Sequence, residues 1–175
     1  PFSERAWEWT KALTVALGMA LFIRYFVFIP VQVEGISMEP TLQPANFILY
    51  HQLSPIERFD IILFLDDYGE VYIKRVVGLP GETIAYQNDR LFIDGERIKE
   101  PFLAQVREEN QVYTADFSIT EAANEQRVPE GHFFVLGDNR PRSKDSRMFG
   151  FVPEASVEGK AQVVIYPLNQ LAWIK

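Results

Sequence analysis

A serine held between a glycine and a proline is the first residue of this chain that could carry out chemistry. The segment reads Gly35-Ile36-Ser37-Met38-Glu39-Pro40-Thr41-Leu42. Because glycine bends freely and proline fixes a turn, such a loop can expose the Ser37 hydroxyl and direct backbone N–H groups toward one point. It is not a Gly-x-Ser-x-Gly nucleophile elbow, because Glu39 stands where the last glycine would be. Alone, the pattern is more typical of an ordinary polar turn.

Lys74 and Arg75 are two adjacent cations within an apolar segment, Tyr72–Glu82, that ends in a Pro-Gly turn. In a strand, alternation places Lys74 with Tyr72 and Val76 on one face and Arg75 on the other, so one of the two cations shares a face with the core or a cleft. A lysine desolvated by apolar neighbours has a lowered pKa and can accept a proton, whereas a guanidinium stays protonated. The segment therefore offers Lys74 as a base. The alternative is a strand with two solvated charges at a sheet edge.

A dense polar segment, Gly137–Pro153, lies between two apolar segments. It offers Ser143 as a hydrogen-bond partner for a catalytic group, and Asp145 with Arg147 as an ion pair. A surface turn rich in Asn, Asp and Ser is the alternative interpretation. The spacing of its Asp residues does not fit an EF-hand calcium loop.

The elements that must position these residues are mainly strands. Apolar segments bounded by turn residues predict strands at Phe47–His51, Phe59–Leu65, Val71–Val77, Arg90–Lys99, His132–Leu136 and Val157–Tyr166. Within Arg90–Lys99, Asp94-Gly95 is typical of a hairpin turn with positive φ angles. No convincing amphipathic helix follows Pro30. The sequence therefore predicts a mostly β catalytic domain at 30–175, an antiparallel sheet or partly open barrel, with a more polar inserted lobe at about 83–129.

An apolar segment, Ala12–Ile29, precedes this domain, and its only charged residue is Arg24. As a helix it would be about 27 Å long, close to the hydrocarbon thickness of a bilayer. Arg5 and Lys11 lie before the segment, and the next Lys or Arg after Arg24 is Arg58. The positive-inside rule then predicts one transmembrane helix within residues 1–29, with a cytoplasmic N-terminus and an exported catalytic domain.

Other interpretations of the apolar segment compete with a spanning helix. A cleavable signal would need small residues at its end, where Phe26–Pro30 stands instead. A buried core helix or an interfacial helix stays open. Arg24 is costly in a bilayer unless its side chain extends to the interface or marks the end of the span.

The composition excludes several functional classes. The chain has 175 residues, a formal net charge of -7 and a pI of about 4.9, which argues against a nucleic-acid-binding protein. It contains no cysteine, so disulfides, thiol catalysis and Cys-based zinc sites are excluded.

Together and in this order, the segments resemble bacterial type I signal peptidases, the Ser-Lys leader peptidases, across nearly the whole chain. The matching blocks are Gly35–Leu42, Arg58–Phe64, Ile73–Gly81 and Gly137–Arg147. The resemblance is to the Gram-positive, cyanobacterial or organellar members, because of the glycine at position 35 and the single short anchor.

The resemblance implies a role for individual residues. Ser37 matches the nucleophile and Lys74 the general base. Ser143 matches a serine that hydrogen-bonds and orients the lysine, and Asp145 with Arg147 matches a supporting ion pair.

Two departures from the family pattern bear on the site. Some members carry a second serine two residues before the nucleophile, where this chain has Gly35. The oxyanion is then expected to be held by backbone N–H, that of Ser37 above all. Pro141 and Arg142 replace the common Asp-Asn and alter the expected shape of the loop before Ser143.

The activity that the resemblance implies is removal of signal peptides from exported precursor proteins through an acyl-enzyme, without metal or cofactor. The partners are then secretory precursors and the lipid bilayer of a plasma membrane or thylakoid. We expect Ile36, Met38 and Ile73 to line pockets that admit only Ala-sized side chains. We also expect Phe26–Ile29 and Trp173 to seat the domain on lipid.

Three other functions compete with a Ser-Lys peptidase. A Ser/His/Asp hydrolase would use His51 or His132, although neither lies in a matching block. A self-cleaving repressor would be soluble and carry a DNA-binding module, and neither feature is evident. A weakly active or inactive paralogue could serve as a membrane-anchored β scaffold, but the presence of both Ser37 and Lys74 argues against loss of function.

Overall fold

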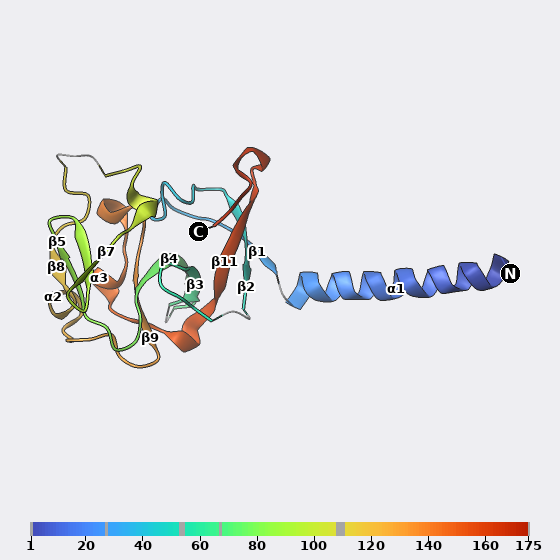
Figure 1. Cartoon of the computed structure of the whole chain (residues 1–175), viewed down its shortest axis with the longest axis horizontal. Helices are drawn as coiled ribbons and strands as arrows, with labels where there is room; N and C mark the ends of the chain where they lie inside the picture. The colour runs from blue at the N-terminus through green and yellow to red at the C-terminus, as the bar shows by residue number, and fades with distance from the viewer. Residues whose placement is uncertain (1, 27, 53–54, 67, 108–110, 175) are drawn as a thin grey trace.

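The computed structural model describes residues 2–26, 28–52, 55–66, 68–107 and 111–174, and the side chains of residues 5–20 within the N-terminal helix. The roles predicted for the side chains of Arg24 and Phe26, and for Val27, lie outside these described residues. The chain consists of one long helix followed by a β domain of two sheets (Figure 1).

The helix α1 (Phe2–Phe26) projects away from the β domain (Figure 1). Its exposed large apolar side chains fall on all sides of a helix with 3.6 residues per turn, and they are Trp7, Trp9, Leu13, Val15, Leu17 and Met19. Within the part of the chain that the structure describes, no helix combines the length and the apolar character that crossing a bilayer requires. The transmembrane helix stays a prediction.

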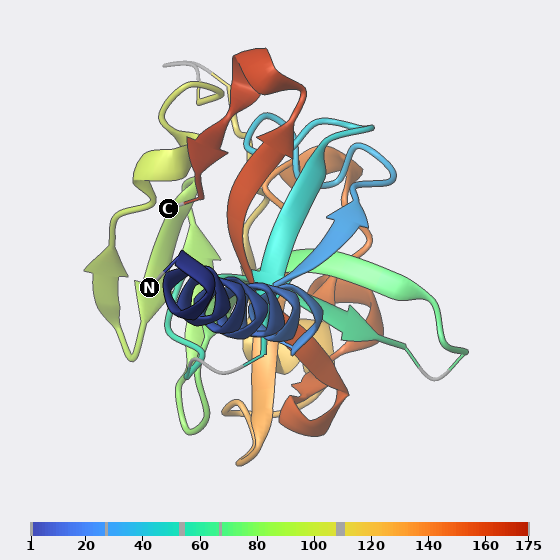
Figure 2. The ribbon, with the colours of Figure 1, turned by 90° about the vertical axis from the view of Figure 1, so that its right-hand side faces the viewer.

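The main sheet has eight antiparallel strands in the order β1-β2-β11-β3-β4-β9-β10, with β12 paired to β11, and it is strongly twisted (Figure 2). The mostly β, antiparallel fold predicted from the sequence is thus confirmed. The bounds are β1 (Ile29–Gln32), β2 (Phe47–His51), β3 (Ile61–Leu65), β4 (Val71–Gly78), β9 (His132–Leu136), β10 (Val152–Pro153), β11 (Val157–Tyr166) and β12 (Ala172–Trp173).

The main sheet separates two apolar cores, which explains why its central strands are apolar without a polar face. In β3, Ile61 and Leu63 join one core, whereas Ile62 and Phe64 join the other. A sheet that is covered on both faces needs apolar residues at successive positions rather than at alternate ones. The strand before the turn at Asp66 is therefore a continuous apolar segment.

A second sheet, in the order β7-β6-β5-β8, lies at the end of the domain far from α1 (Figure 1). Its strands come from the segment predicted as an inserted lobe, and they are β5 (Ile84–Gln87), β6 (Arg90–Ile93), β7 (Glu96–Ile98) and β8 (Phe117–Ser118). A third core, to which Ile84 and Tyr86 contribute, joins this sheet to Phe134 of β9. Asp94 and Gly95 have φ angles of 48° and 83°, so the predicted hairpin turn is confirmed.

Most of the strands expected from the sequence occur within a residue or two of their predicted bounds. The short strands β1, β5, β8, β10 and β12 were not predicted, and neither was the turn at Asn88-Asp89 that joins β5 to β6. The helices after Pro30 are single turns, α2 (Ile119–Ala123), α3 (Ser146–Phe149), η1 (Pro101–Leu103), η2 (Arg140–Arg142), η3 (Glu154–Ser156) and η4 (Leu168–Gln170).

Candidate active site

Ser37 and Lys74 meet at the middle of β4, although 37 positions separate them in the chain. Lys74 Nζ lies 2.9 Å from Ser37 Oγ and also donates to the carbonyl oxygen of Ile73 at 2.9 Å. Ser37 lies in the turns that follow β1 and is partly exposed, whereas Lys74 is only 3% exposed. A solvent-accessible hydroxyl thus contacts an amine that water barely reaches.

Burial changes the acidity of Lys74. Desolvation lowers its pKa to about 8, and the nearby Asp145 carboxylate opposes this effect by favouring the charged form. The amine is therefore neutral in about a tenth of the molecules at pH 7, far more than for an exposed lysine, and this form can accept the proton of Ser37. The alternative of two solvated edge charges on β4 is wrong, because Arg75 is also fully buried.

The polar segment Gly137–Pro153 folds around a buried carboxylate. Asp145 accepts hydrogen bonds from Arg147 Nε and Nη2, both at 2.8 Å, and from the backbone N–H of Gly137 at 3.0 Å. Arg147 also donates to the carbonyl oxygen of Arg140 at 2.7 Å. The expected ion pair between Asp145 and Arg147 is present, and the hydrogen bonds of these two residues to Gly137 and Arg140 connect it to the start of this loop.

Ser143 lies beside the dyad, but its hydroxyl is not bonded to Lys74. Ser143 Oγ is buried and has no hydrogen-bond partner among the described residues. A Cβ added to Gly137 would lie 2.1 Å from Ser143 Oγ and 2.5 Å from the carbonyl oxygen of Ser37, so only glycine permits this close approach. The structure places Ser143 against the Ser37 loop, and its role in orienting the lysine stays a prediction.

Asp138 and Asn139, which the sequence analysis did not single out, hold the Ser37 loop against β4. Asp138 accepts from Arg75 Nε at 2.8 Å and Nη2 at 2.6 Å, and it also accepts from the Thr41 hydroxyl. Asn139 donates from its backbone to the carbonyl oxygen of Ser37 at 3.0 Å and from its side chain to that of Ile36 at 3.1 Å. The Asp-Asn pair in the third polar segment was the available signal, because both side chains readily bind backbone and hydroxyl groups.

The backbone before Ser37 explains the glycine found there. Gly35 has a φ of 77°, in the left-handed region that disfavours other residues, and open space lies where its Cβ would be. A side chain at this position would be strained rather than crowded. The predicted role of backbone N–H groups in holding the oxyanion stays a prediction.

The two histidines make other contacts. His51 Nε2 lies 2.8 Å from Gln162 Nε2, and His132 Nδ1 lies 2.9 Å from the carbonyl oxygen of Glu130. Ser37 instead has Lys74 as its side-chain partner. Among the described residues, no three acidic or histidine side chains gather to hold a metal ion.

A cleft of about 760 Å³ opens in front of the dyad. It is lined by residues 31–38 and 70–74, together with Arg142 and Lys144. All three residues expected to form substrate pockets line it, and Ile36 is 38% exposed, whereas Met38 and Ile73 are buried. β9 pairs with β4 only from Arg75 onward, so the first half of β4 has one edge without a strand partner among the described strands.

Comparisons with known proteins agree with this site. Residues 6–166 match the family model described as signal peptidase, peptidase S26. Signal peptidase I of Bacillus caldolyticus is 43% identical, covering 97% of this chain and 94% of its own length. Signal peptidase I V of Bacillus subtilis (strain 168) is 42% identical, covering 86% of this chain and 94% of its own.

A solved structure shares the fold as well as the sequence. The crystal structure of a signal peptidase I from Enterococcus faecalis V583 has a TM-score of 0.58 and 49% sequence identity, covering 62% of this chain and 98% of that chain. The chain therefore belongs to peptidase S26, the signal peptidase family, and resembles within it the type I enzymes of Gram-positive bacteria.

Proposed function

We propose that this signal peptidase removes N-terminal signal peptides from exported precursor proteins, with Ser37 as nucleophile and Lys74 as general base. The observation that carries the assignment of residues is the 2.9 Å contact between Ser37 Oγ and the amine of a buried lysine. The names of the relatives support the reaction, and the geometry of the cleft supports a peptide as substrate. A scaffold without activity has no need of a desolvated lysine, whose burial is costly.

The reaction proceeds through an acyl-enzyme. Neutral Lys74 accepts the Ser37 proton while the oxygen attacks the scissile carbonyl carbon, and backbone N–H groups, with that of Ser37 foremost, stabilise the oxyanion. Lys74 then donates this proton to the leaving amine as the peptide C–N bond breaks. A water that gives its proton to Lys74 then attacks the acyl carbon, and Lys74 returns this proton to Ser37 Oγ as the acyl C–O bond breaks. Asp145 and Arg147 hold the polar loop against the dyad throughout.

The cleft favours an extended peptide. The unpaired edge of β4 at Val71–Lys74 offers backbone hydrogen bonds to an added strand, as in other β-augmentation complexes. Side chains of that strand would alternate between the two faces of the sheet. Those directed toward Ile36, Met38 and Ile73 would meet an apolar floor, which supports a preference for small residues before the cleaved bond.

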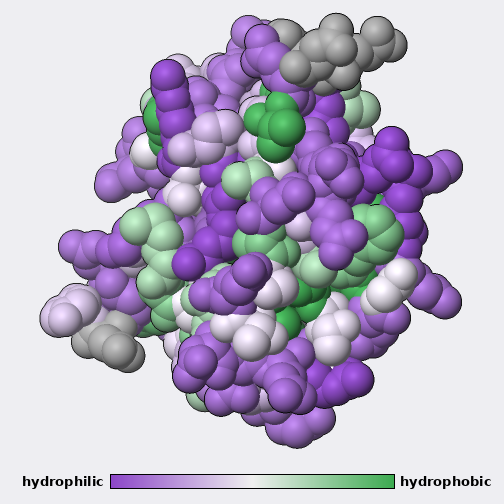
Figure 3. Space-filling model, turned by 90° about the vertical axis from the view of Figure 1, so that its left-hand side faces the viewer, coloured by the Kyte–Doolittle hydropathy of each residue, from purple (hydrophilic) through white to green (hydrophobic). Residues whose placement is uncertain are grey.

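Attachment to a membrane is part of this proposal. Exposed apolar side chains lie on all sides of α1, and further ones lie on β2, on β11, on β12 and in the turn between β11 and β12, namely Phe47, Tyr166, Leu168, Leu171 and Trp173. The face turned away from α1 is mainly hydrophilic (Figure 3). We place α1 across the bilayer, with its N-terminus in the cytoplasm and the catalytic domain on the exported face. Protease treatment of sealed vesicles that contain the full chain tests this orientation, because only an outward domain would be digested.

The decisive experiment compares cleavage of a secretory precursor in liposomes by the full chain and by its Lys74→Ala variant, with Lys99→Ala as the matched control. We expect the wild type and Lys99→Ala to cut after a small residue, and Lys74→Ala to lose this activity. Cleavage by Lys74→Ala would place the base elsewhere and restore a histidine mechanism. Absence of cleavage by all three proteins would contradict the proposed reaction.

A further inference from the structure

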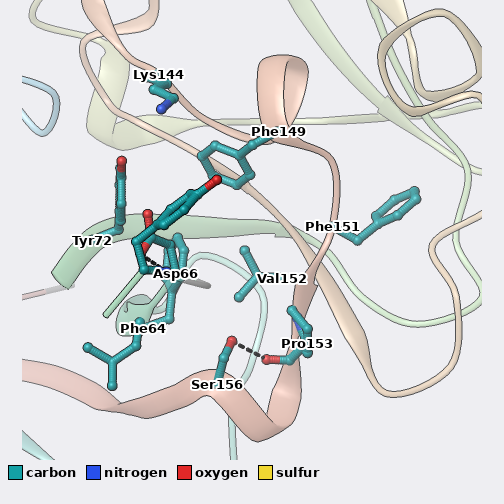
Figure 4. Close-up of a pocket in the computed structure, with 11 residues that line it drawn as sticks. Phe64, Asp66, Tyr72, Lys144, Phe149, Phe151, Val152, Pro153 and Ser156 are labelled. Atoms are coloured by element: carbon teal, nitrogen blue, oxygen red, sulfur yellow. Dashed lines mark hydrogen bonds between the residues drawn. The ribbon is translucent and has the colours of Figure 1, made fainter. Parts of the chain in front are cut away.

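A second pocket, of about 230 Å³, lies beside the catalytic cleft. Five aromatic residues line it, and three of their rings form a cluster in which the centroids of Phe64 and Tyr72 are 5.7 Å apart and that of Phe149 lies 6.1 Å and 6.0 Å from them (Figure 4). Val152 adds a buried apolar wall. Because a dry apolar cavity of about 150 Å³ can hold benzene, this pocket has room for one aromatic or large aliphatic side chain.

The pocket and the catalytic cleft share two residues, Tyr72 and Lys144, which line both. The Tyr72 ring is the common wall: Lys74 Nζ lies 5.4 Å from its centroid and Lys144 Nζ lies 6.0 Å from it. Figure 4 shows Lys144 near Tyr72 and Phe149 at one end of the pocket. A peptide that occupies the cleft next to Lys74 can therefore reach the pocket by passing Tyr72.

The chemistry of the dyad indicates which part of the peptide passes there. The acyl half of the substrate stays on Ser37 Oγ, whereas the leaving amine must come within hydrogen-bond reach of Lys74 Nζ to receive its proton. Because Lys74 Nζ faces the Tyr72 ring, the chain that begins at the leaving amine starts beside the shared wall. Met38 and Ile73, which are expected to line the small-residue pockets, belong to the core on one face of the main sheet, whereas Tyr72 packs against the core on the other face.

We propose that this aromatic pocket binds a large apolar side chain from the first residues after the cleaved bond, and so selects among precursors by the start of the mature protein. The proposal rests on the proposed function. Its ligand is the leaving half of the precursor, with aromatic residues preferred because offset and edge-on ring contacts are available from Tyr72 and Phe149. Small residues at the same position would leave the pocket empty.

The test uses the full chain in detergent and a set of signal-peptide substrates that differ only in the first three residues after the bond. One substrate has alanine at all three positions, and three others carry phenylalanine at one of them. The enzymes are the wild type, Phe149→Ala, and Phe47→Ala as a control, because Phe47 and Phe149 are equally exposed at 36% and 37% but only Phe149 lines the pocket. A fourth enzyme, Ser156→Phe, would fill the pocket from its far wall.

For the wild type and Phe47→Ala, we expect phenylalanine at one of the three positions to raise kcat/KM about tenfold over the alanine substrate. Phe149→Ala and Ser156→Phe should lose this preference. The preference is a ratio within one enzyme, so a general loss of activity from altered folding does not change it. The proposed role of the pocket would be wrong if the ratio of kcat/KM between the phenylalanine and alanine substrates were equal in all four enzymes, or if the wild type cut both kinds of substrate equally well. Either result would leave the proposed function intact. Failure of the wild type to cut any substrate would overturn both.

Discussion

β4 carries two neighbouring cations whose surroundings differ. Lys74 is buried without an ion-pair partner among the described residues, and its amine contacts a hydroxyl and a carbonyl oxygen. Arg75, one position later on the opposite face, forms a two-pronged ion pair with Asp138, donates to the carbonyl oxygen of Phe59 at 2.7 Å and stacks on Phe102 at 3.9 Å. The same strand thus holds one cation whose pKa burial lowers to about 8 and one that the fold keeps charged.

The difference shows how burial can serve either chemistry or structure. Burial of a lysine without a counter-ion lowers its pKa, so the neutral amine, which can act as a base, is populated at a lower pH. A buried charge with a hydrogen-bonded counter-ion fixes the elements that carry the two partners. Here Arg75 and Asp138 fix β4 against the Ser37 loop, so the paired cation holds the unpaired one in contact with Ser37.

The largest loss of activity is expected when Lys74 is replaced by a cation that cannot lose its proton. We expect Lys74→Arg to lower kcat/KM for precursor cleavage by about 10³-fold or more, because the guanidinium stays charged and cannot accept the Ser37 proton. Single-turnover cleavage with excess enzyme measures the effect on the chemical step. A variant that retains a tenth of wild-type activity would show that Lys74 is not the base.

Removing the paired cation tests the structural half of the comparison. Arg75→Ala leaves Asp138 buried without its counter-ion, and we expect it to lower the free energy of unfolding by about 3–5 kcal/mol. The control is Arg127→Ala, because Arg127 pairs with Asp94 at an exposed site where both side chains are about half accessible or more. That change should cost less than about 1 kcal/mol. Similar losses in denaturant titrations of the two variants would contradict the distinction drawn between the cations.

Removal of Lys74, the cation without an ion-pair partner among the described residues, is expected to raise the free energy of unfolding. Burial lowers the pKa of Lys74 from 10.5 to about 8, so the unfolded chain holds this proton more tightly than the folded one. The contribution of Lys74 to the free energy of unfolding therefore rises with pH between about 8 and 10.5, and this contribution is lowest below pH 8. We expect Lys74→Met to be inactive yet more stable than the wild type by about 2 kcal/mol at pH 7.

Thermal unfolding of both proteins in detergent measures this difference. The advantage of Lys74→Met should shrink as the pH rises from 8 toward 10.5, because the wild-type lysine is then neutral in both states. An advantage that does not change with pH would come from packing rather than from the charge.

The sequence predicted the catalytic half of this arrangement better than the structural half. Ser37 and Lys74 lie in long blocks that a family pattern identifies, and the apolar neighbours of Lys74 in β4 predict its desolvation. The ion pair of Asp145 and Arg147 is local in sequence, so spacing alone suggests it. By contrast, the pairing of Arg75 with Asp138 joins residues 63 positions apart, and periodicity carries no information about such contacts.

The fold shows the same limit. Strands of five or more residues, such as β2 and β11, gave enough residues for a pattern, whereas β8 and β10 have two each. The sequence also could not show that the Ser143 hydroxyl makes no hydrogen bond to Lys74, because this depends on how closely Ser143 approaches Gly137 and the Ser37 loop. To predict that Lys74 and Arg75 are both buried, one would have to know that both faces of the main sheet are covered.

The pH dependence of activity gives the smallest but most direct measure of the unpaired cation. Since burial lowers the pKa of Lys74 to about 8, we expect kcat/KM to rise about tenfold per pH unit below pH 8 and to level off above it. Asp145 favours the charged amine, so Asp145→Asn should move this rise to lower pH, whatever its effect on the maximum rate. A rise centred near pH 6.5 that His51→Ala or His132→Ala abolishes would assign the base to a histidine. A rise that stays in place in Asp145→Asn would show that desolvation alone sets the acidity of Lys74, and that the buried carboxylate acts only through the ion pair with Arg147.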